Sequence, residues 1–254
     1  MSSRLVDAHA HLVAPEFDAD RAEVLDRARA AGVKAVVAVG ETLADAERNL
    51  ELAAARPDGM IRPAAGLYPT VLDREQAAAV EALIRRERAR LIAIGEVGLD
   101  HWKVQDPAER QLQREILLGF VRLSIETGLP LNVHSRSAGK ATIDLLLAAG
   151  ATGVLLHAFD GRASTAQPAV EAGFLFSVPP SVVRSPQKQK LVRRLPLDCL
   201  LVETDSPVLG PELGVRNEPA NVTVSVRAIA ELKAVAEEAV IEAVEENQRR
   251  LFSI

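Results

Sequence analysis

The chain begins with two histidines at the spacing of a metal-binding pair. His9 and His11 close the first apolar run, in the segment Asp-Ala-His-Ala-His (7–11). Residues two apart on a strand project from the same face, about 7 Å apart at a rise of ~3.3 Å per residue. Two imidazoles placed in this way can bind one transition-metal ion. The same pair could also lie on a solvated strand end, so other ligands must decide between the two interpretations.

Further residues that can bind metal stand where later apolar runs end. Glu96 closes the run Leu-Ile-Ala-Ile-Gly-Glu (91–96), His134 and His157 close two later runs, and Asp205 follows the last. An imidazole or carboxylate buried without a partner is costly. The recurrence therefore favours one shared site over separate capping or pairing roles. Nitrogen and oxygen ligands of this kind suit two divalent cations.

The apolar runs predict eight strands that alternate with helices. The runs lack clean alternation, which is typical of strands buried on both faces. Eight such units predict one (β/α)8 barrel over residues 1–254, with the C-terminal strand ends meeting at one mouth. The predicted strands are Leu5–His9, Val33–Val39, Ile61–Gly66, Leu91–Glu96, Leu129–His134, Gly153–His157, Phe174–Val178 and Cys199–Glu203. The predicted helices are Asp20–Ala31, Thr42–Arg56, Asp73–Arg90, Asp106–Thr127, Gly139–Ala149, Arg162–Ala172, Pro186–Arg194 and Ala220–Leu251.

An open doubly wound sheet is the main alternative fold. Such sheets usually carry a Gly-rich phosphate-binding turn after the first strand, whereas this chain has His-Ala-His there. No linker rich in Pro, Gly or Ser divides the chain, which favours a single domain. The basic segment Arg85–Arg90 is interpreted as a solvated helix end, since basic residues favour the last turn of a helix.

Composition argues against a protein that binds nucleic acid through a broad positive surface. The formal net charge is −5 over 254 residues, so no overall positive field attracts phosphate. A nuclease that engages a strand end is still allowed, because bound metal supplies local positive charge. The single cysteine, Cys199, cannot form an intramolecular disulfide and suits a reducing compartment. Without a signal-peptide pattern or a run of ~18 apolar residues, we expect a cytoplasmic protein with no membrane segment.

The motifs resemble the TatD family of metal-dependent deoxyribonucleases almost from end to end. Asn247 and Leu251-Phe252 also resemble the family's closing helix. The matching segments are Asp-Ala-His-Ala-His-Leu (7–12), Ala-Ile-Gly-Glu-Val-Gly-Leu-Asp (93–100), Val-His-Ser-Arg (133–136), Leu-His-Ala-Phe-Asp-Gly (156–161), Glu-Thr-Asp-Ser-Pro (203–207) and Arg-Asn-Glu-Pro (216–219). The resemblance implies a hydrolase that cleaves DNA with two divalent ions, Zn²⁺, Mg²⁺ or Mn²⁺.

The resemblance also implies a role for each ligand. His9, His11 and Asp205 match the group that holds the first ion, Glu96 the carboxylate that bridges both, and His134 and His157 the ligands of the second. Glu96 and Asp205 are the predicted catalytic residues. Asp205 is the candidate to orient and deprotonate the attacking water, because a ligating carboxylate keeps a second oxygen free.

Four further residues are candidates for substrate contact. Arg136, two residues beyond His134, could clamp a phosphate or form a salt bridge at the barrel rim. Arg216 could do the same or fix its own loop, and His101 could contact substrate or lie exposed. Tyr68 stands where the family commonly has a histidine. The segments Leu-Asp-His-Trp (99–102) and Ala-Phe-Asp-Gly (158–161) also depart from the family pattern, and we expect them to line the substrate pocket.

Two other functions fit parts of the pattern. The same metal site could hydrolyse a small amide, ester, lactone or phosphoester, since loops set the substrate in this fold. Glu96 argues for the nuclease, because many small-molecule relatives use a carbamylated lysine on the fourth strand. A non-catalytic scaffold is expected to lose ligands, and all are present here. The chain has few aromatic residues to stack bases, which favours brief end-on engagement over a long strand platform. We expect DNA as the substrate, single-stranded or at strand ends, and infer no obligate protein partner.

Overall fold

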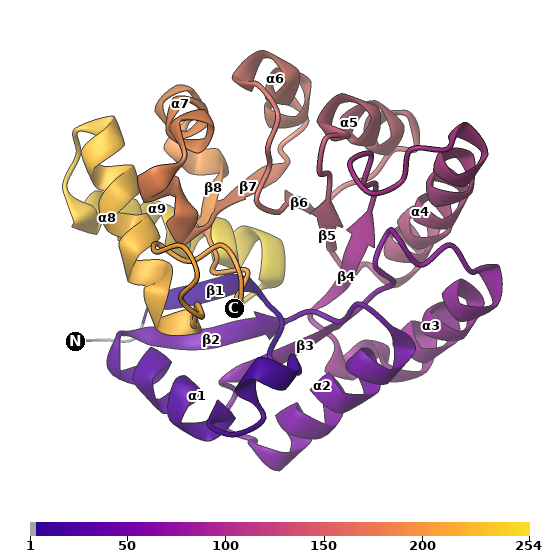
Figure 1. Ribbon diagram of the computed structural model, residues 1–254, viewed down its shortest axis with the longest axis horizontal. Helices are drawn as coiled ribbons and strands as arrows, with labels where there is room; N and C mark the ends of the chain where they lie inside the picture. Colours follow the sequence, from indigo (N-terminus) through magenta and orange to yellow (C-terminus); the bar gives the residue numbers. More distant parts are fainter. Residues whose placement is uncertain (1–3) are drawn as a thin grey trace.

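The computed structural model describes residues 4–254, which form a nearly closed barrel of eight parallel strands (Figure 1). Neighbours in the sheet are neighbours in the sequence, from β1 to β8, which confirms the predicted (β/α)8 fold. The strands are β1 (Leu5–Ala10), β2 (Val33–Ala38), β3 (Ile61–Ala65), β4 (Ala93–Gly98), β5 (Leu131–His134), β6 (Val154–Leu156), β7 (Leu175–Val178) and β8 (Leu200–Val202). The α-helices are α1 (Arg21–Ala30), α2 (Leu43–Ala55), α3 (Arg74–Glu87), α4 (Pro107–Thr127), α5 (Gly139–Ala148), α6 (Ala163–Glu171), α7 (Pro186–Arg194), α8 (Val222–Lys233) and α9 (Glu237–Phe252).

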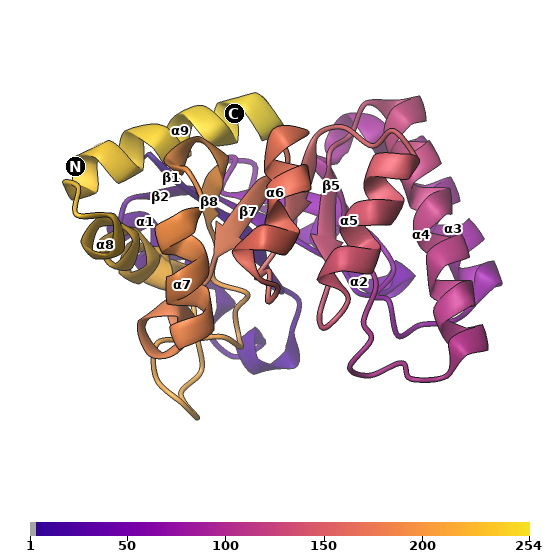
Figure 2. The same cartoon turned by 90° about the horizontal axis from the view of Figure 1, so that it is seen from above.

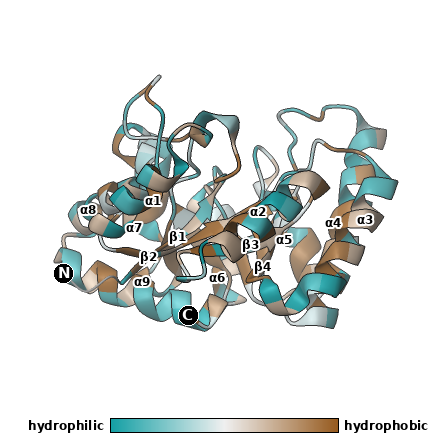
Figure 3. Cartoon of the chain, turned by 90° about the horizontal axis from the view of Figure 1, so that it is seen from below, coloured by the Kyte–Doolittle hydropathy of each residue, from teal (hydrophilic) through white to brown (hydrophobic). Residues whose placement is uncertain are grey.

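Both faces of the sheet are covered, as the apolar runs predicted. Every residue of β1, β4, β5 and β8 is buried. The strands are mostly brown in Figure 3, whereas the surrounding helices mix teal and brown. One face of each strand packs against helices and the other fills the barrel, so most strand residues are apolar.

Capping side chains fix the loops at the mouth of the barrel. Thr42 forms a capping box with Asp45 at the start of α2. Asp73 and Asp106 accept hydrogen bonds from first-turn amides of α3 and α4. These bonds satisfy donors that a helix leaves unpaired at its N-terminus. Because each of these helices follows a strand, the caps also set where the loops leave the mouth.

The barrel closes between β1 and β8 through the buried side chain of Asp7. The amide of Thr204 donates to Asp7 Oδ1 at 2.8 Å, and the Thr204 hydroxyl donates to Oδ2. Beyond the strands, the amide of Asp205 donates to the carbonyl of His9 at 2.8 Å. The seam therefore holds together the two segments that carry His9 and Asp205.

The C-terminal segment differs from the prediction of one helix over Ala220–Leu251. The structure divides it into α8 and α9, because Ala234 adopts the left-handed conformation (φ 53°) and ends α8. Helix α9 lies across the N-terminal end of the barrel (Figure 2). There the Asn247 amide donates to the carbonyls of Leu197 and Leu200, at 2.9 and 2.8 Å, and so anchors the helix under β8.

Strand β4 runs further than its predicted end at Glu96. Val97 pairs with Val133 and Gly98 with His134, so the ladder with β5 continues for two residues. Glu96 thus lies inside a strand, where its backbone is held on both sides.

The basic segment Arg85–Arg90 lies on the surface, as predicted. Arg85 pairs with Glu126, and Arg90 pairs with Glu87. These pairs neutralise charge that a nucleic-acid surface would need. Separately, none of the helices in residues 4–254 has the length and hydropathy that a bilayer crossing requires.

Candidate metal centre

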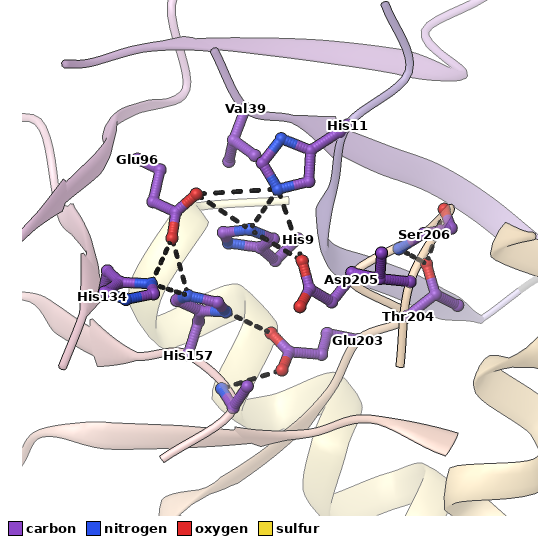
Figure 4. A network of polar contacts seen from close by, with 12 residues as sticks. His9, His11, Val39, Glu96, His134, His157, Glu203, Thr204, Asp205 and Ser206 are labelled. Atoms are coloured by element: carbon purple, nitrogen blue, oxygen red, sulfur yellow. Dashed lines mark hydrogen bonds and ion pairs between the residues drawn. The ribbon is translucent and has the colours of Figure 1, made fainter. Parts of the chain in front are cut away.

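Six side chains converge where the strands end at the mouth (Figure 4). They come from five strands or from residues up to three positions beyond them. They are His9 on β1, His11 after it, Glu96 on β4, His134 on β5, His157 after β6 and Asp205 after β8. The structure therefore brings together every residue that the sequence proposed as a ligand.

Glu96 lies between two pairs of histidines. Its Oε1 is 2.7 Å from His134 Nδ1 and 2.9 Å from His157 Nε2. Its Oε2 is 3.6 Å from His11 Nε2 and 3.8 Å from His9 Nε2. Each carboxylate oxygen faces a different pair, which is the arrangement that a carboxylate shared by two cations requires.

Asp205 completes the group around His9 and His11. Its Oδ1 is 3.3 Å from His11 Nε2 and 3.5 Å from His9 Nε2. Three overlapping sets of possible ligand atoms result, each within 4.8 Å of one another. They are His9, His157 and Asp205; His9, His11 and Glu96; and Glu96, His134 and His157.

The contacts within the cluster fit bound divalent cations. Among residues 4–254, Glu96 Oε2 is buried and finds no hydrogen-bond partner, which is costly for a carboxylate oxygen. His9 Nε2 lies 3.3 Å from His11 Nε2, and His134 Nδ1 lies 3.2 Å from His157 Nε2. Two such nitrogens satisfy each other only if one donates and the other accepts. Cations shared between them would satisfy all of these atoms at once.

Charge within the cluster favours cations at the same place. Burial lowers the pKa of His11, but Asp205 and Glu96 outweigh it and raise that pKa to about 9. Burial and the neighbouring His157 lower the pKa of His9 to about 3, which keeps its ring neutral. Burial opposes ionisation of Glu96, yet His157 and His134 hold its pKa well below the usual range. A cation that binds must displace protons, so affinity should rise with pH.

Two side chains outside the predicted ligand set, Asn132 and Asp100, orient the histidines. Asn132 Oδ1 lies 2.9 Å from His9 Nδ1, and its Nδ2 donates to the Ala8 carbonyl at 2.9 Å. Because the Asn132 side-chain amide is fixed in this way, its oxygen accepts a hydrogen bond from Nδ1 of His9. Nε2 of His9 is then free as a ligand atom. Asp100 Oδ2 lies 3.1 Å from His134 Nε2, so Nδ1 of that ring faces Glu96.

The segment that carries His157 is held by a second buried network. Glu203 Oε2 is 3.7 Å from His157 Nδ1 and accepts from the Ser177 hydroxyl at 2.6 Å. Glu203 Oε1 accepts from the Ala158 amide at 2.8 Å, and Lys188 Nζ donates to the Ala158 carbonyl at 2.8 Å. These bonds fix the residue that follows His157, and with it the direction of the imidazole.

A cavity of about 650 Å³ opens onto the cluster. All six candidate ligands except His9 line it, and so do Tyr68 and Arg136. The Tyr68 and His134 rings meet edge to face, with centroids 5.2 Å apart. Burial and the nearby Glu96 raise the pKa of the Tyr68 phenol, so its hydroxyl stays protonated and can donate into the cavity.

His101 and Arg216 lie away from this cavity. His101 lines a separate hollow beside the start of α5. Arg216 donates to both carboxylate oxygens of Asp20, at 2.7 and 2.6 Å, and to the Glu16 carbonyl at 2.6 Å. These bonds fix its own loop, which was one of the two expected roles. Asp160 likewise accepts from a backbone amide, that of Ser137, at 2.9 Å.

The whole chain matches a known family. A family model described as TatD related DNase matches residues 6–253. The chain belongs to the TatD family. The deoxyribonuclease TATDN3 of Homo sapiens is 45% identical over 262 residues, covering 98% of this TatD chain and 94% of the human protein.

Other members support the match in sequence and in structure. The uncharacterized metal-dependent hydrolase YabD of Bacillus subtilis is 34% identical, covering 98% of this TatD chain and 99% of the relative. The crystal structure of YJJV, a TatD homolog from Escherichia coli K12, superposes with a TM-score of 0.92 at 26% identity, over 100% of both chains. The fold and chain length therefore agree with the family throughout.

Proposed function

We propose that this TatD-family protein is a metal-dependent hydrolase that cleaves phosphodiester bonds in DNA. The observation that carries the proposal is Glu96, whose two oxygens face separate histidine pairs in a buried cluster. Relatives across nearly the whole chain are named deoxyribonuclease or metal-dependent hydrolase, which supports the same reaction. The barrel over residues 1–254 acts as one domain in this proposal.

Two divalent ions, Zn²⁺, Mg²⁺ or Mn²⁺, are the proposed cofactors. Glu96 would hold both ions, His9, His11 and Asp205 would hold one of them, and His134 and His157 would hold the other. When bound, such a pair polarises a phosphodiester and lowers the pKa of water at the site. The nitrogen and oxygen donors present suit each of these metals.

The protein's own groups supply the proton transfer and the alignment. Asp205 presents Oδ1 to the histidines, and its other oxygen accepts the proton of the attacking water. The Tyr68 hydroxyl donates a hydrogen bond to a phosphate oxygen, because the phenol stays protonated at neutral pH. Arg136 binds a phosphate at the cavity wall with its fork of N–H donors.

Single strands or frayed ends are the proposed substrates. A cavity of about 650 Å³ is of the size that holds a small organic ligand, so it suits a nucleotide unit better than an intact duplex. No protein partner is required by this proposal. The buried, unpaired Cys199 suits a reducing compartment, so the cytoplasm is the proposed location.

The test is cleavage of end-labelled single-stranded DNA by metal-stripped protein, with each divalent metal restored in turn. We expect cleavage only after metal is restored. Full activity in excess chelator would exclude the proposed function. Turnover of a small ester or phosphoester without any cleavage of DNA would instead assign the centre to small-molecule hydrolysis.

A further inference from the structure

The rim of the cavity carries an aromatic side chain that the metal centre does not use. Trp102 is 51% exposed. The Arg136 guanidinium lies 3.8 Å from its ring centroid, and Lys103 Nζ lies 5.0 Å from it. A large aromatic ring that stays half exposed beside two cations suggests a binding surface rather than packing.

Backbone hydrogen bonds fix this group relative to the metal centre. Asp100 Oδ1 accepts from the amides of Trp102 and Lys103, at 2.9 and 2.7 Å. The other oxygen of Asp100 lies 3.1 Å from His134 Nε2. One carboxylate thus positions both the exposed ring and a candidate ligand. The Arg136 carbonyl also accepts a hydrogen bond from the amide of His101, the residue before Trp102, at 3.0 Å.

Arg136 keeps its charge available for a ligand. Among residues 4–254 it forms no ion pair, whereas Arg216 is neutralised by Asp20. Stacking on Trp102 orders the guanidinium without occupying its in-plane N–H donors. Because Arg136 also lines the cavity, those donors lie within reach of a phosphate beside the metal centre.

We propose that Trp102, Arg136 and Lys103 form a subsite for the nucleotide next to the scissile phosphodiester. The inference rests on the proposed function and names the feature of DNA that this site selects. Arg136 binds the neighbouring phosphate, Lys103 adds positive charge, and the exposed part of Trp102 stacks on the adjoining base. A base inside a duplex is covered on both faces by its neighbours, so the subsite favours unpaired bases in single strands and frayed ends.

The single tryptophan of the chain makes this subsite directly observable. A short, labelled oligothymidylate is added to the whole protein in excess chelator, so that binding is measured without cleavage. Fluorescence anisotropy of the label reports strand binding, and intrinsic emission reports Trp102. We expect the emission to change with the same midpoint as the anisotropy. An abasic oligomer of equal length should bind roughly tenfold more weakly and leave the emission nearly unchanged.

Variants separate stacking from a structural role. In Trp102→Ala we expect the dissociation constant and KM to rise roughly tenfold, with a smaller change in kcat. Trp102→Phe keeps an aromatic face and should retain most of the affinity. Leu213→Ala is the matched control, because Leu213 is another exposed apolar side chain (79%) and does not line the cavity.

Each outcome decides the proposal. The subsite would be overturned if strand binding left the Trp102 emission unchanged and if Trp102→Ala bound the strand with the same dissociation constant as the parent. DNA cleavage as the proposed function would still stand. Loss of folding in Trp102→Ala, seen by circular dichroism, leaves the emission of the unmodified protein as the deciding measurement. Failure of the protein both to bind and to cleave single strands would overturn the subsite together with the proposed function.

Discussion

Position, more than residue type, separates the carboxylates around the metal centre. Glu96 presents one oxygen to each histidine pair, whereas Asp205 presents a single oxygen to His9 and His11. Asp100 contacts His134 Nε2, the ring nitrogen that does not face Glu96. It therefore does not face the space between the two histidine pairs. Substitutions at these carboxylates should therefore affect different properties: metal bridging, proton transfer and ring orientation.

Asn132→Leu should weaken metal binding without unfolding the barrel. The change removes the oxygen that fixes the His9 ring, so that Nε2 is no longer held ready as a ligand atom. Loss of such an outer partner typically lowers metal affinity by roughly 10–100-fold. Calorimetric titration of metal-stripped protein with zinc measures this affinity. Asn132→Asp keeps an acceptor oxygen and should lose less zinc affinity than Asn132→Leu. Equal affinity in all three proteins would exclude an orienting role.

That the six candidate ligands lie together could be predicted from sequence, and the residues around them only in part. His134 and Glu96 were found because each ends or nearly ends an apolar run. Asn132 shares a strand face with His134 by its spacing of two, a signal that could have identified it. Lys188 offers no such signal, since it reaches the site from α7. The contacts of Arg216 depend on how its loop folds back, which spacing does not determine.

At the scale of elements, the β1–β8 seam depends on one buried side chain. Asp7→Ala would leave the Thr204 amide without its acceptor, whereas the Thr204 hydroxyl can still donate to Ser206 Oγ at 3.0 Å. A buried donor left unsatisfied costs about 1–3 kcal/mol, so the free energy of unfolding should fall by about that amount. Urea denaturation followed by circular dichroism measures the loss. Asp7→Asn keeps one acceptor oxygen and should be milder, and equal stability of all three proteins would contradict this account of the seam.

The turn between α2 and β3 should contribute stability that depends on pH. Burial opposes ionisation of Asp58, but the Met60 amide, Arg29 and Arg56 outweigh it and lower its pKa to about 2. A lowered pKa stabilises the fold above the unfolded value of about 3.9, and that contribution is lost as pH falls towards 2. Asp58→Asn should therefore have a lower Tm than the parent at pH 5–7, with the difference shrinking towards pH 2. A constant difference across this range would contradict the assignment.

The order of elements was predictable, whereas some of their ends were not. Apolar runs revealed all eight strands because both faces are buried. The break between α8 and α9 was missed because Ala234 takes a left-handed conformation that glycine or asparagine usually signals. The true end of β4 at Gly98 depends on pairing with His134, a long-range contact that local pattern does not contain.

For the whole molecule, charge predicts weakly salt-dependent binding of DNA. The net charge is −5, and the cavity and its rim offer only a few cations, Arg48, Arg136 and Lys103. Each phosphate contact to a single strand contributes about −0.7 to the slope of log K against log salt. We expect a slope of about −1 to −2 by anisotropy in excess chelator. A slope steeper than about −4 would indicate a wider positive surface than the structure has.

The central claim is that Glu96, shared between two histidine pairs, makes this barrel a metal-dependent nuclease. The most direct test compares cleavage of end-labelled single-stranded DNA by the parent protein, Glu96→Gln and the control Glu81→Gln, a matched substitution on α3. With the same restored metal, we expect Glu96→Gln to lose at least about a hundredfold in rate and Glu81→Gln to match the parent. Cleavage by Glu96→Gln within a few-fold of the parent rate would contradict the account.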